Sequence, residues 1–492
     1  MNSRKIFVIL IFTFSTIIIS AGHYLNLTLK PPHKDGMHYI AYAYNTLKYG
    51  VYSHSRSENP ESNNRREPMY PMALMVAMII DPGINLSIQD AKCITKGKNC
   101  VDQVTNLKVL NIFSLMICAL LSSCFIYTYS KNIFASFTSF ILISLSGQLG
   151  RYTSTFYTET FAALLLITAS YLLYKITEDS FTRRKALLTG LVLGALALTK
   201  AIYYYFLYLN FVLLLILWCY QGIGFRKAIV RVVIILSGSM VLIAPWIVHN
   251  YIKVGTLSIV GGRSGVNLLA RARLNEITTK EYLAEFLLLL PDNRIVQNLE
   301  YRYISPELKE RVRNRNYYRL AYAEQDRIKK ATGLRGFKLN DYILDLGIKK
   351  ILKNFKKHLS LIPLVSLNGI YKTEIGFGFQ KFKNDYKYKT ISEKYFDLSL
   401  SKYQFPVSKN FNYFIYIVLL GTFIVSMVNR KWSMVWFMLP MLYCFGMYAV
   451  LTPFASRFSY HFIPVLIICT IIAIFKISLF LKLRITRVYK RI

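Results

Sequence analysis

Acidic residues are scarce in this chain of 492 residues. It has 25 Asp and Glu against 61 Lys and Arg, so its formal net charge is +36. There is no Asp-x-Asp pair and no His/Cys group with metal-ligand spacing. Because protein metal sites are built from such groups, the sequence does not indicate a required metal ion, and we expect no cofactor.

Cysteine is sparse as well, with seven residues. Cys93 and Cys100 share one loop. Whether they form a disulfide depends on the compartment and stays open, but their spacing is not that of a metal site. The other five fall in apolar runs, where we expect packing residues: Cys118, Cys124, Cys219, Cys444 and Cys469.

Long apolar runs, in contrast, are plentiful. The chain is 54% hydrophobic and 15% aromatic, which is too apolar for an ordinary soluble enzyme. A helix needs about 20 apolar residues to cross a bilayer. We therefore predict an all-α polytopic membrane protein of about ten transmembrane helices, the first retained rather than cleaved as a signal peptide. The ten runs cover residues 6–22, 108–129, 133–149, 156–174, 186–199, 202–219, 229–248, 411–428, 433–451 and 460–481.

The basic residues predict the orientation of the chain. With a cytoplasmic N-terminus, 17 Lys and Arg fall in cytoplasmic loops and ends, and three fall in short outer loops. This bias satisfies the positive-inside rule and places both termini in the cytoplasm. Topology thus accounts for much of the charge, and we reject a nucleic-acid partner. The abundance of Lys, Asn, Ile and Tyr is compatible with an AT-rich bacterium, whose inner (plasma) membrane would hold the protein.

Two long segments lie on the outer side in this topology. Residues 1–248 form an N-terminal transmembrane module that includes the first of them, 23–107. Residues 249–410 form a mostly helical outer domain, and 411–492 hold the C-terminal transmembrane helices. The outer domain has 30 basic against 15 acidic residues, which suits anionic lipid headgroups, lipid phosphates or an acidic glycan.

The first outer loop is predicted to carry two interfacial helices. Residues 35–49 have apolar side chains at helical spacing, and five tyrosines between residues 39 and 52 suit the membrane interface. Residues 69–80 are apolar but too short to span. In the outer domain, the charged stretch 300–357 has helical composition, and 359–371 is apolar enough to enter the interface.

Three carboxylates at the outer level are candidates for chemistry. Asp35 opens the predicted helix 35–49, where a capping role is the alternative. Glu67 stands beside Arg66, and a solvated salt bridge would explain it equally. Glu159 is the only acidic residue in the apolar runs. Its burial is costly unless it is paired, for instance with Arg151 or Tyr157, or faces a wet cavity.

Basic side chains are predicted at the same level. Each alone is explained by snorkelling to lipid headgroups. Together with the carboxylates they could hold a lipid phosphate while a carboxylate acts on an acceptor. They are Arg151, Lys200, His249 and Arg457.

The order of several short motifs resembles a known family. Asp35, His38-Tyr39, Ala41, Gly50 and then Arg66-Glu67-Pro68-x-Tyr70-Pro71 look like the first outer loop of GT-C class glycosyltransferases. The branch they resemble holds the protein mannosyltransferases and lipid A aminoarabinose transferases. Later stretches agree, with His249 where the family often has Arg and Phe458 where it has Tyr. They are Thr158-Glu159-Thr160, Ala197-Leu198-Thr199-Lys200, Ala244-Pro245-Trp246-x-x-His249-Asn250-Tyr251-x-x-x-Gly255 and Arg457-Phe458-x-x-x-Phe462-x-Pro464. The resemblance covers residues 1–260 well, 430–480 loosely and 261–410 hardly at all.

The resemblance implies a GT-C-like fold and an inverting sugar transferase on the outer face. The donor would be a polyprenyl-phosphate-linked sugar, and the acceptor a glycan, lipid or protein. Asp35 would be the catalytic carboxylate and Glu67 would assist at the acceptor. Cationic side chains would offset charge on the departing phosphate, namely Arg66, Lys200, His249 and Arg457.

Two other functions remain open from the sequence. A lipid-glycan flippase or transporter usually carries ionisable residues along the membrane midplane, whereas Glu159 sits at one edge. An O-antigen-type polymerase or ligase would share the compartment and the lipid-linked substrates. It does not predict an acidic residue early in the first outer loop, where Asp35 stands.

Overall fold

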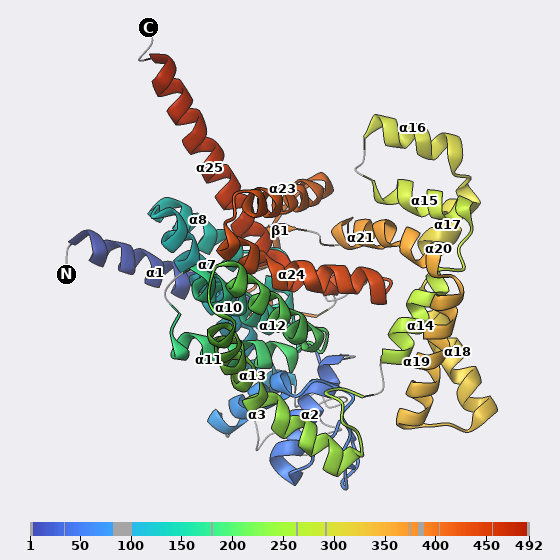
Figure 1. Cartoon of the computed structure of the whole chain (residues 1–492). Coiled ribbons are helices and arrows are strands. Elements are labelled where there is room, and N and C mark those ends of the chain that lie inside the picture. The colour runs from blue at the N-terminus through green and yellow to red at the C-terminus, as the bar shows by residue number, and fades with distance from the viewer. Residues whose placement is uncertain are drawn as a thin grey trace.

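The computed structural model is built almost entirely of helices (Figure 1). It describes residues 3–33, 35–81, 101–178, 181–261, 264–290, 293–371, 373, 375–381, 388–402, 404–454 and 456–489. The short strands β1 (Gly376–Gly378) and β2 (Gln404–Pro406) pair antiparallel. The bundle contains α1 (Ser3–Leu25), α7 (Val109–Ser130), α8 (Ile133–Ser144), α10 (Glu159–Glu178), α11 (Arg183–Ala197), α12 (Ile202–Tyr220), α13 (Phe225–Val254), α23 (Lys409–Val428), α24 (Trp432–Leu451) and α25 (Ile463–Tyr489).

The chain is a multi-pass membrane protein, as the apolar runs predicted. Among the described residues, eight helices are long and apolar enough to cross a bilayer. Their outer surfaces keep large apolar side chains exposed, such as Phe14 at 66% and Ile17 at 61% on α1, which lipid would cover. The predicted number of ten spans is not confirmed. The other two predicted spans hold α8 and α11, which have only 12 and 15 residues.

Helix α11 makes a close backbone contact with α13. A Cβ placed on Gly190 would lie 2.0 Å from the carbonyl oxygen of Ile235 on α13, and one on Gly194 would meet Ser239. Glycine therefore lets the two backbones touch, as small residues do between membrane helices. The helix then ends at the turn around Lys200.

The two predicted helices of the first outer loop are confirmed as α2 (Asp35–Tyr49) and α3 (Met69–Ile80). The prediction that the tyrosines of residues 39–52 face the membrane interface was wrong for four of five. Tyr39, Tyr42, Tyr44 and Tyr52 are each no more than 5% exposed. Helix α2 packs on α3 and the start of α10, so these rings fill the protein interior.

Residues 249–410, which the sequence predicts on the outer side and which we call the outer segment, are mostly helical, as predicted. One small core joins α14, α18 and α19, and another joins α15 to α17. Figure 1 shows these helices gathered on one side of the bundle, with α21 beside α24. The helices are α14 (Ser264–Leu274), α15 (Thr279–Leu289), α16 (Arg294–Tyr303), α17 (Pro306–Asn314), α18 (Tyr317–Thr332), α19 (Gly336–Lys353), α20 (Phe355–Ser360), α21 (Ile362–Tyr371) and α22 (Ile391–Tyr395).

A fully buried arginine ties the outer segment to the bundle. Arg271 on α14 donates hydrogen bonds to the carbonyl oxygens of Ala449 on α24, at 3.3 Å, and His358 on α20, at 3.0 Å. Its third partner is Asn275, at 2.9 Å. These bonds satisfy the guanidinium without a carboxylate, and burial lowers its pKa to about 10. The outer segment is therefore fixed against the end of α24.

The cysteine prediction holds in part. Cys118, Cys444 and Cys469 are buried, but Cys124 and Cys219 are exposed on the helix surface and are not packing residues. They stand on the outward sides of α7 and α12, where the apolar period of a membrane helix continues toward lipid. Cys93 and Cys100 lie outside the described residues.

A reporter experiment tests the orientation of the chain. Fusions after Lys185 and Lys431 are expected to report a cytoplasmic location, and a fusion at residue 310 an external one, because the short basic loops stay inside. Paired phosphatase and fluorescent-protein fusions at the same sites provide the measurement and its internal control. A cytoplasmic signal at residue 310 would contradict the topology and place Asp35 on the other side.

Candidate active site

Asp35 lies between two arginines from distant parts of the chain. Its Oδ1 forms an ion pair with Arg66, which precedes α3, and its Oδ2 is 2.7 Å from Nη1 of Arg457. Arg457 lies in a short 3-10 helix (Ser456–Phe458) before α25. Asp35 is 8% exposed and the side chain of Arg66 is 6% exposed, whereas that of Arg457 is 35% exposed. The open side of the cluster is thus at Arg457.

A second ion pair joins Glu159 and Lys200. Nζ of Lys200 is 3.2 Å from Oε1 of Glu159, and Glu159 is only 2% exposed. Its other oxygen, Oε2, is buried and has no hydrogen-bond partner among the described residues. Glu159 is the first residue of α10, where the helix dipole favours a negative charge.

Glu67 connects the two ion pairs through the backbone. Its Oε1 accepts a hydrogen bond from the amide of Ala201, which follows Lys200, at 3.3 Å. The amide of Met69 donates to the carbonyl of Leu198 at 3.1 Å. The segment that carries Arg66 and Glu67 is therefore held against the turn between α11 and α12.

Aromatic rings enclose the charged groups. The guanidinium of Arg66 lies over the ring of Tyr39, 5.4 Å from its centroid, and that of Arg457 lies 5.9 Å from the centroid of Tyr157. The hydroxyl of Tyr52 donates toward the carbonyl oxygens of Arg66 and Glu67, each 3.1 Å away. These contacts hold the cations by cation–π attraction and fix the loop.

The charges and burial of the site shift several pKa values. Burial raises the pKa of Tyr157 to about 12, with Asp35 adding to the effect. Burial and the charge of Arg66 lower the pKa of His38 to about 3, so His38 stays neutral and cannot add another cation. Burial alone would lower the pKa of Arg457, but Asp35 and Glu159 outweigh it and raise this pKa.

Two predicted residues lie outside these two groups of ion-paired side chains, as far as the described part of the chain extends. His249 stacks on Trp246, with ring centroids 4.9 Å apart, and Trp246 in turn contacts Tyr52. Arg151 donates to Gln148 on its own short helix α9 (Gly147–Thr153). No group of three or more His, Cys, Asp or Glu side chains gathers around a metal position within the part of the chain that the structure describes.

The sequence did not single out the residues that complete the site. Tyr157 was considered only as a partner of Glu159, and the amide of Ala201 carries no side-chain signal. The ring of Tyr39 was assigned to the membrane interface. The only sequence feature that connected Tyr39 with the site was its place beside His38 in the quoted motif.

No protein-family model matches the chain, and no curated protein sequence matches it. Among solved structures it is similar to the archaeal oligosaccharyltransferase AglB from Archaeoglobus fulgidus, in complex with an inhibitory peptide and a dolichol-phosphate. The identity is 13% and the TM-score 0.47, covering 99% of this chain and 52% of that chain. This chain thus spans about half the length of the oligosaccharyltransferase.

A second similar structure is ArnT from Cupriavidus metallidurans in the apo state. The identity is 10% and the TM-score 0.34, covering 95% of this chain and 78% of that chain. ArnT is a lipid A aminoarabinose transferase, the branch that the sequence motifs resemble. At these identities and TM-scores the likeness does not assign a function to this chain.

Proposed function

We propose that the protein is a membrane glycosyltransferase that moves a sugar from a polyprenyl-phosphate donor to an acceptor hydroxyl or amide on the outer face. The observation that carries the proposal is the buried carboxylate of Asp35 between Arg66 and Arg457. A carboxylate can take a proton from an acceptor. Arginines match the geometry of a phosphate.

The carboxylate of Asp35 binds both arginines, as a phosphate would. We infer that the donor phosphate takes up part of the arginine hydrogen bonding, starting with Arg457, whose side chain is the more exposed. Asp35 then keeps its ion pair with Arg66, and the oxygen released by Arg457 is free to take the proton of the acceptor. Donor binding would in this way prepare the base.

The reaction is a single displacement. The acceptor oxygen or nitrogen attacks the anomeric carbon as its proton passes to Asp35, and the bond from that carbon to the phosphate oxygen breaks. The leaving group is the polyprenyl phosphate, whose charge the arginines stabilise. Attack opposite the leaving group inverts the anomeric centre.

Glu159 is proposed to bind a hydroxyl or ammonium group of the sugar. A buried carboxylate oxygen without a partner is costly, and a sugar hydroxyl would satisfy it. Lys200 holds the other oxygen and so orients the carboxylate. Glu67 would lie closer to the acceptor, beside the amide of Ala201. Because Oε2 of Glu159 can only accept a hydrogen bond, the favoured sugars present a hydroxyl or ammonium donor to it.

The Glu159→Gln protein tests this role. We expect the KM for the donor to rise about tenfold, with a smaller change in kcat, because the amide replaces a charged acceptor by a neutral one. Steady-state kinetics at varied donor concentration measure both constants. The control is Glu310→Gln, an exposed acid on α17. If both the thermal stability and kcat fell while KM stayed the same, Glu159 would have only a structural role.

The function itself is tested by transfer in purified form. The full-length protein in detergent is incubated with a panel of polyprenyl-phosphate sugars and membrane extract as the acceptor source. Release of free polyprenyl phosphate that depends on the acceptor, with an inverted anomeric configuration in the product, is the expected result. Movement of the lipid-linked sugar across vesicles without bond cleavage would instead identify a flippase.

A further inference from the structure

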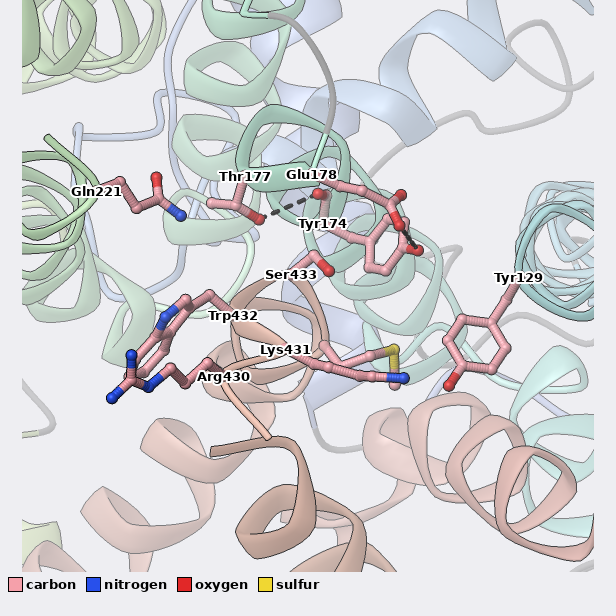
Figure 2. A pocket seen from close by; sticks show the side chains of 10 residues that line it. Tyr129, Tyr174, Thr177, Glu178, Gln221, Arg430, Lys431, Trp432 and Ser433 are labelled. Carbon is pink, nitrogen blue, oxygen red and sulfur yellow. Dashed lines mark hydrogen bonds between the residues drawn. The ribbon is translucent and has the colours of Figure 1, made fainter. Parts of the chain in front are cut away.

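A pocket of about 300 Å³ opens at the end of the bundle opposite the candidate active site (Figure 2). Helix α10 begins at Glu159 and ends at Glu178, and its 20 residues separate the two places by about 30 Å. The pocket lies where the short basic loops gather, which the sequence predicts to be cytoplasmic. It is lined by Tyr129, Tyr174, Thr177, Glu178, Gln221, Arg430, Lys431, Trp432, Ser433 and Met434.

Arg430 and Lys431 are neighbours in the chain, and their side chains lie at opposite ends of the pocket. Arg430 has a left-handed backbone, with φ at 53°, and the chain turns there from α23 into α24. Figure 2 shows Arg430 beside Trp432 at one end of the pocket and Lys431 reaching toward Tyr129 at the other. Arg430 and Lys431 are both exposed and line the same pocket as Glu178. A ligand in the pocket can therefore reach both positive charges.

The lining also contains an acceptor for a hydroxyl group. The hydroxyl of Tyr174 donates to Oε1 of Glu178, which fixes the carboxylate and leaves it further acceptor capacity. The side chain of Gln221 faces the pocket as well (Figure 2). Two cations and one carboxylate that line the same pocket suit an anion that itself carries a hydrogen-bond donor.

The remaining lining residues are typical of a membrane surface. Trp432 and Tyr129 are amphipathic rings of the kind that gather at the headgroup level. Trp432 and Ser433 form the first turn of α24, and the start of a helix favours a negative group nearby. Basic pockets between transmembrane helices on the cytoplasmic side suit acidic lipid headgroups.

We propose that this pocket binds the headgroup of an anionic glycerophospholipid of the inner leaflet. The phosphodiester would lie between Arg430 and Lys431, and a headgroup hydroxyl would donate to Glu178. Phosphatidylglycerol has this chemistry, whereas phosphatidylcholine has the phosphodiester without a donor. The site is separate from the proposed transfer reaction, so its test does not depend on finding the sugar donor.

The test measures lipid retention on the full-length protein in detergent by native mass spectrometry. Phosphatidylglycerol and phosphatidylcholine with identical acyl chains are the probes. The parent protein is expected to retain phosphatidylglycerol at least about tenfold better than phosphatidylcholine. A hydrogen bond to a charged group changes an equilibrium constant by about this factor. The double variant Arg430→Gln, Lys431→Gln is expected to lose this preference. Both side chains are exposed, so the fold is preserved.

The matched control is Arg226→Gln, Lys227→Gln, an exposed basic pair at the start of α13 on the same end of the bundle. It removes the same charge and is expected to leave the preference unchanged. Glu178→Gln is expected to reduce the difference in retention between phosphatidylglycerol and phosphatidylcholine. Equal loss in the control pair, or full retention in the pocket pair, would overturn the site. Displacement of the lipid by millimolar glycerol 3-phosphate would show a soluble phosphate site instead.

Discussion

An Asp35→Asn protein is expected to turn over roughly 10²- to 10⁴-fold more slowly than the parent. Asparagine has the same shape but cannot take a proton from the acceptor. The change also releases Arg66 and Arg457 from their carboxylate partner. Donor affinity is therefore expected to stay equal or to rise, since both arginines become available to the phosphate.

The measurement combines turnover, donor binding and thermal unfolding on the purified protein. Asp81→Asn is the matched control, because Asp81 is an exposed acid of the same outer loop at the end of α3. Normal turnover in a well-expressed Asp35→Asn protein would remove Asp35 from the reaction. A parallel loss of donor binding and thermal stability would reduce it to a structural ion pair.

An Arg457→Gln protein is expected to bind the polyprenyl-phosphate sugar about 10- to 100-fold more weakly. This range corresponds to about 1.5–3 kcal/mol for a charged hydrogen bond. Arg457 is the better choice than Arg66, because its side chain is 35% exposed against 6%. Asp35 also keeps Arg66 as a partner, so the buried carboxylate is not left alone.

Donor binding is measured by competition with a labelled polyprenyl phosphate. Arg457→Lys retains the charge without the fork geometry of arginine and is expected to restore part of the affinity. Lys349→Gln, on the exposed face of α19, is the control for net charge. If Arg457→Gln bound the donor as tightly as the parent, Arg457 would have no role in the donor site and would only contact lipid headgroups.

Lys200 and Arg457, both expected near the donor phosphate, have different carboxylate partners. Arg457 pairs with Asp35, and Lys200 pairs with Glu159. A Lys200 substitution would therefore leave a buried carboxylate without its cation, which is costly. Its effect on donor binding would be mixed with a loss of stability.

The sequence by itself determined the membrane class and the position of most helices. Apolar length decides whether a segment crosses a bilayer, because backbone groups in lipid must be satisfied within the helix. This is a local property, so residues 202–219 and 433–451 were predicted close to α12 and α24. The predicted spans 133–149 and 186–199 hold the shorter helices α8 and α11, of 12 and 15 residues, so helix length does not confirm these two as spans.

Only the tertiary structure decided which charges meet. Asp35, Arg66 and Arg457 were each marked as candidates by residue type and motif, but their pairing depends on how the start of α2 lies against the entry to α25. The buried tyrosines of α2 show the same limit, because amphipathic rings fit both a lipid interface and a protein core. Helical period and residue type are local, whereas partners of a side chain are set by contacts between segments far apart in the chain.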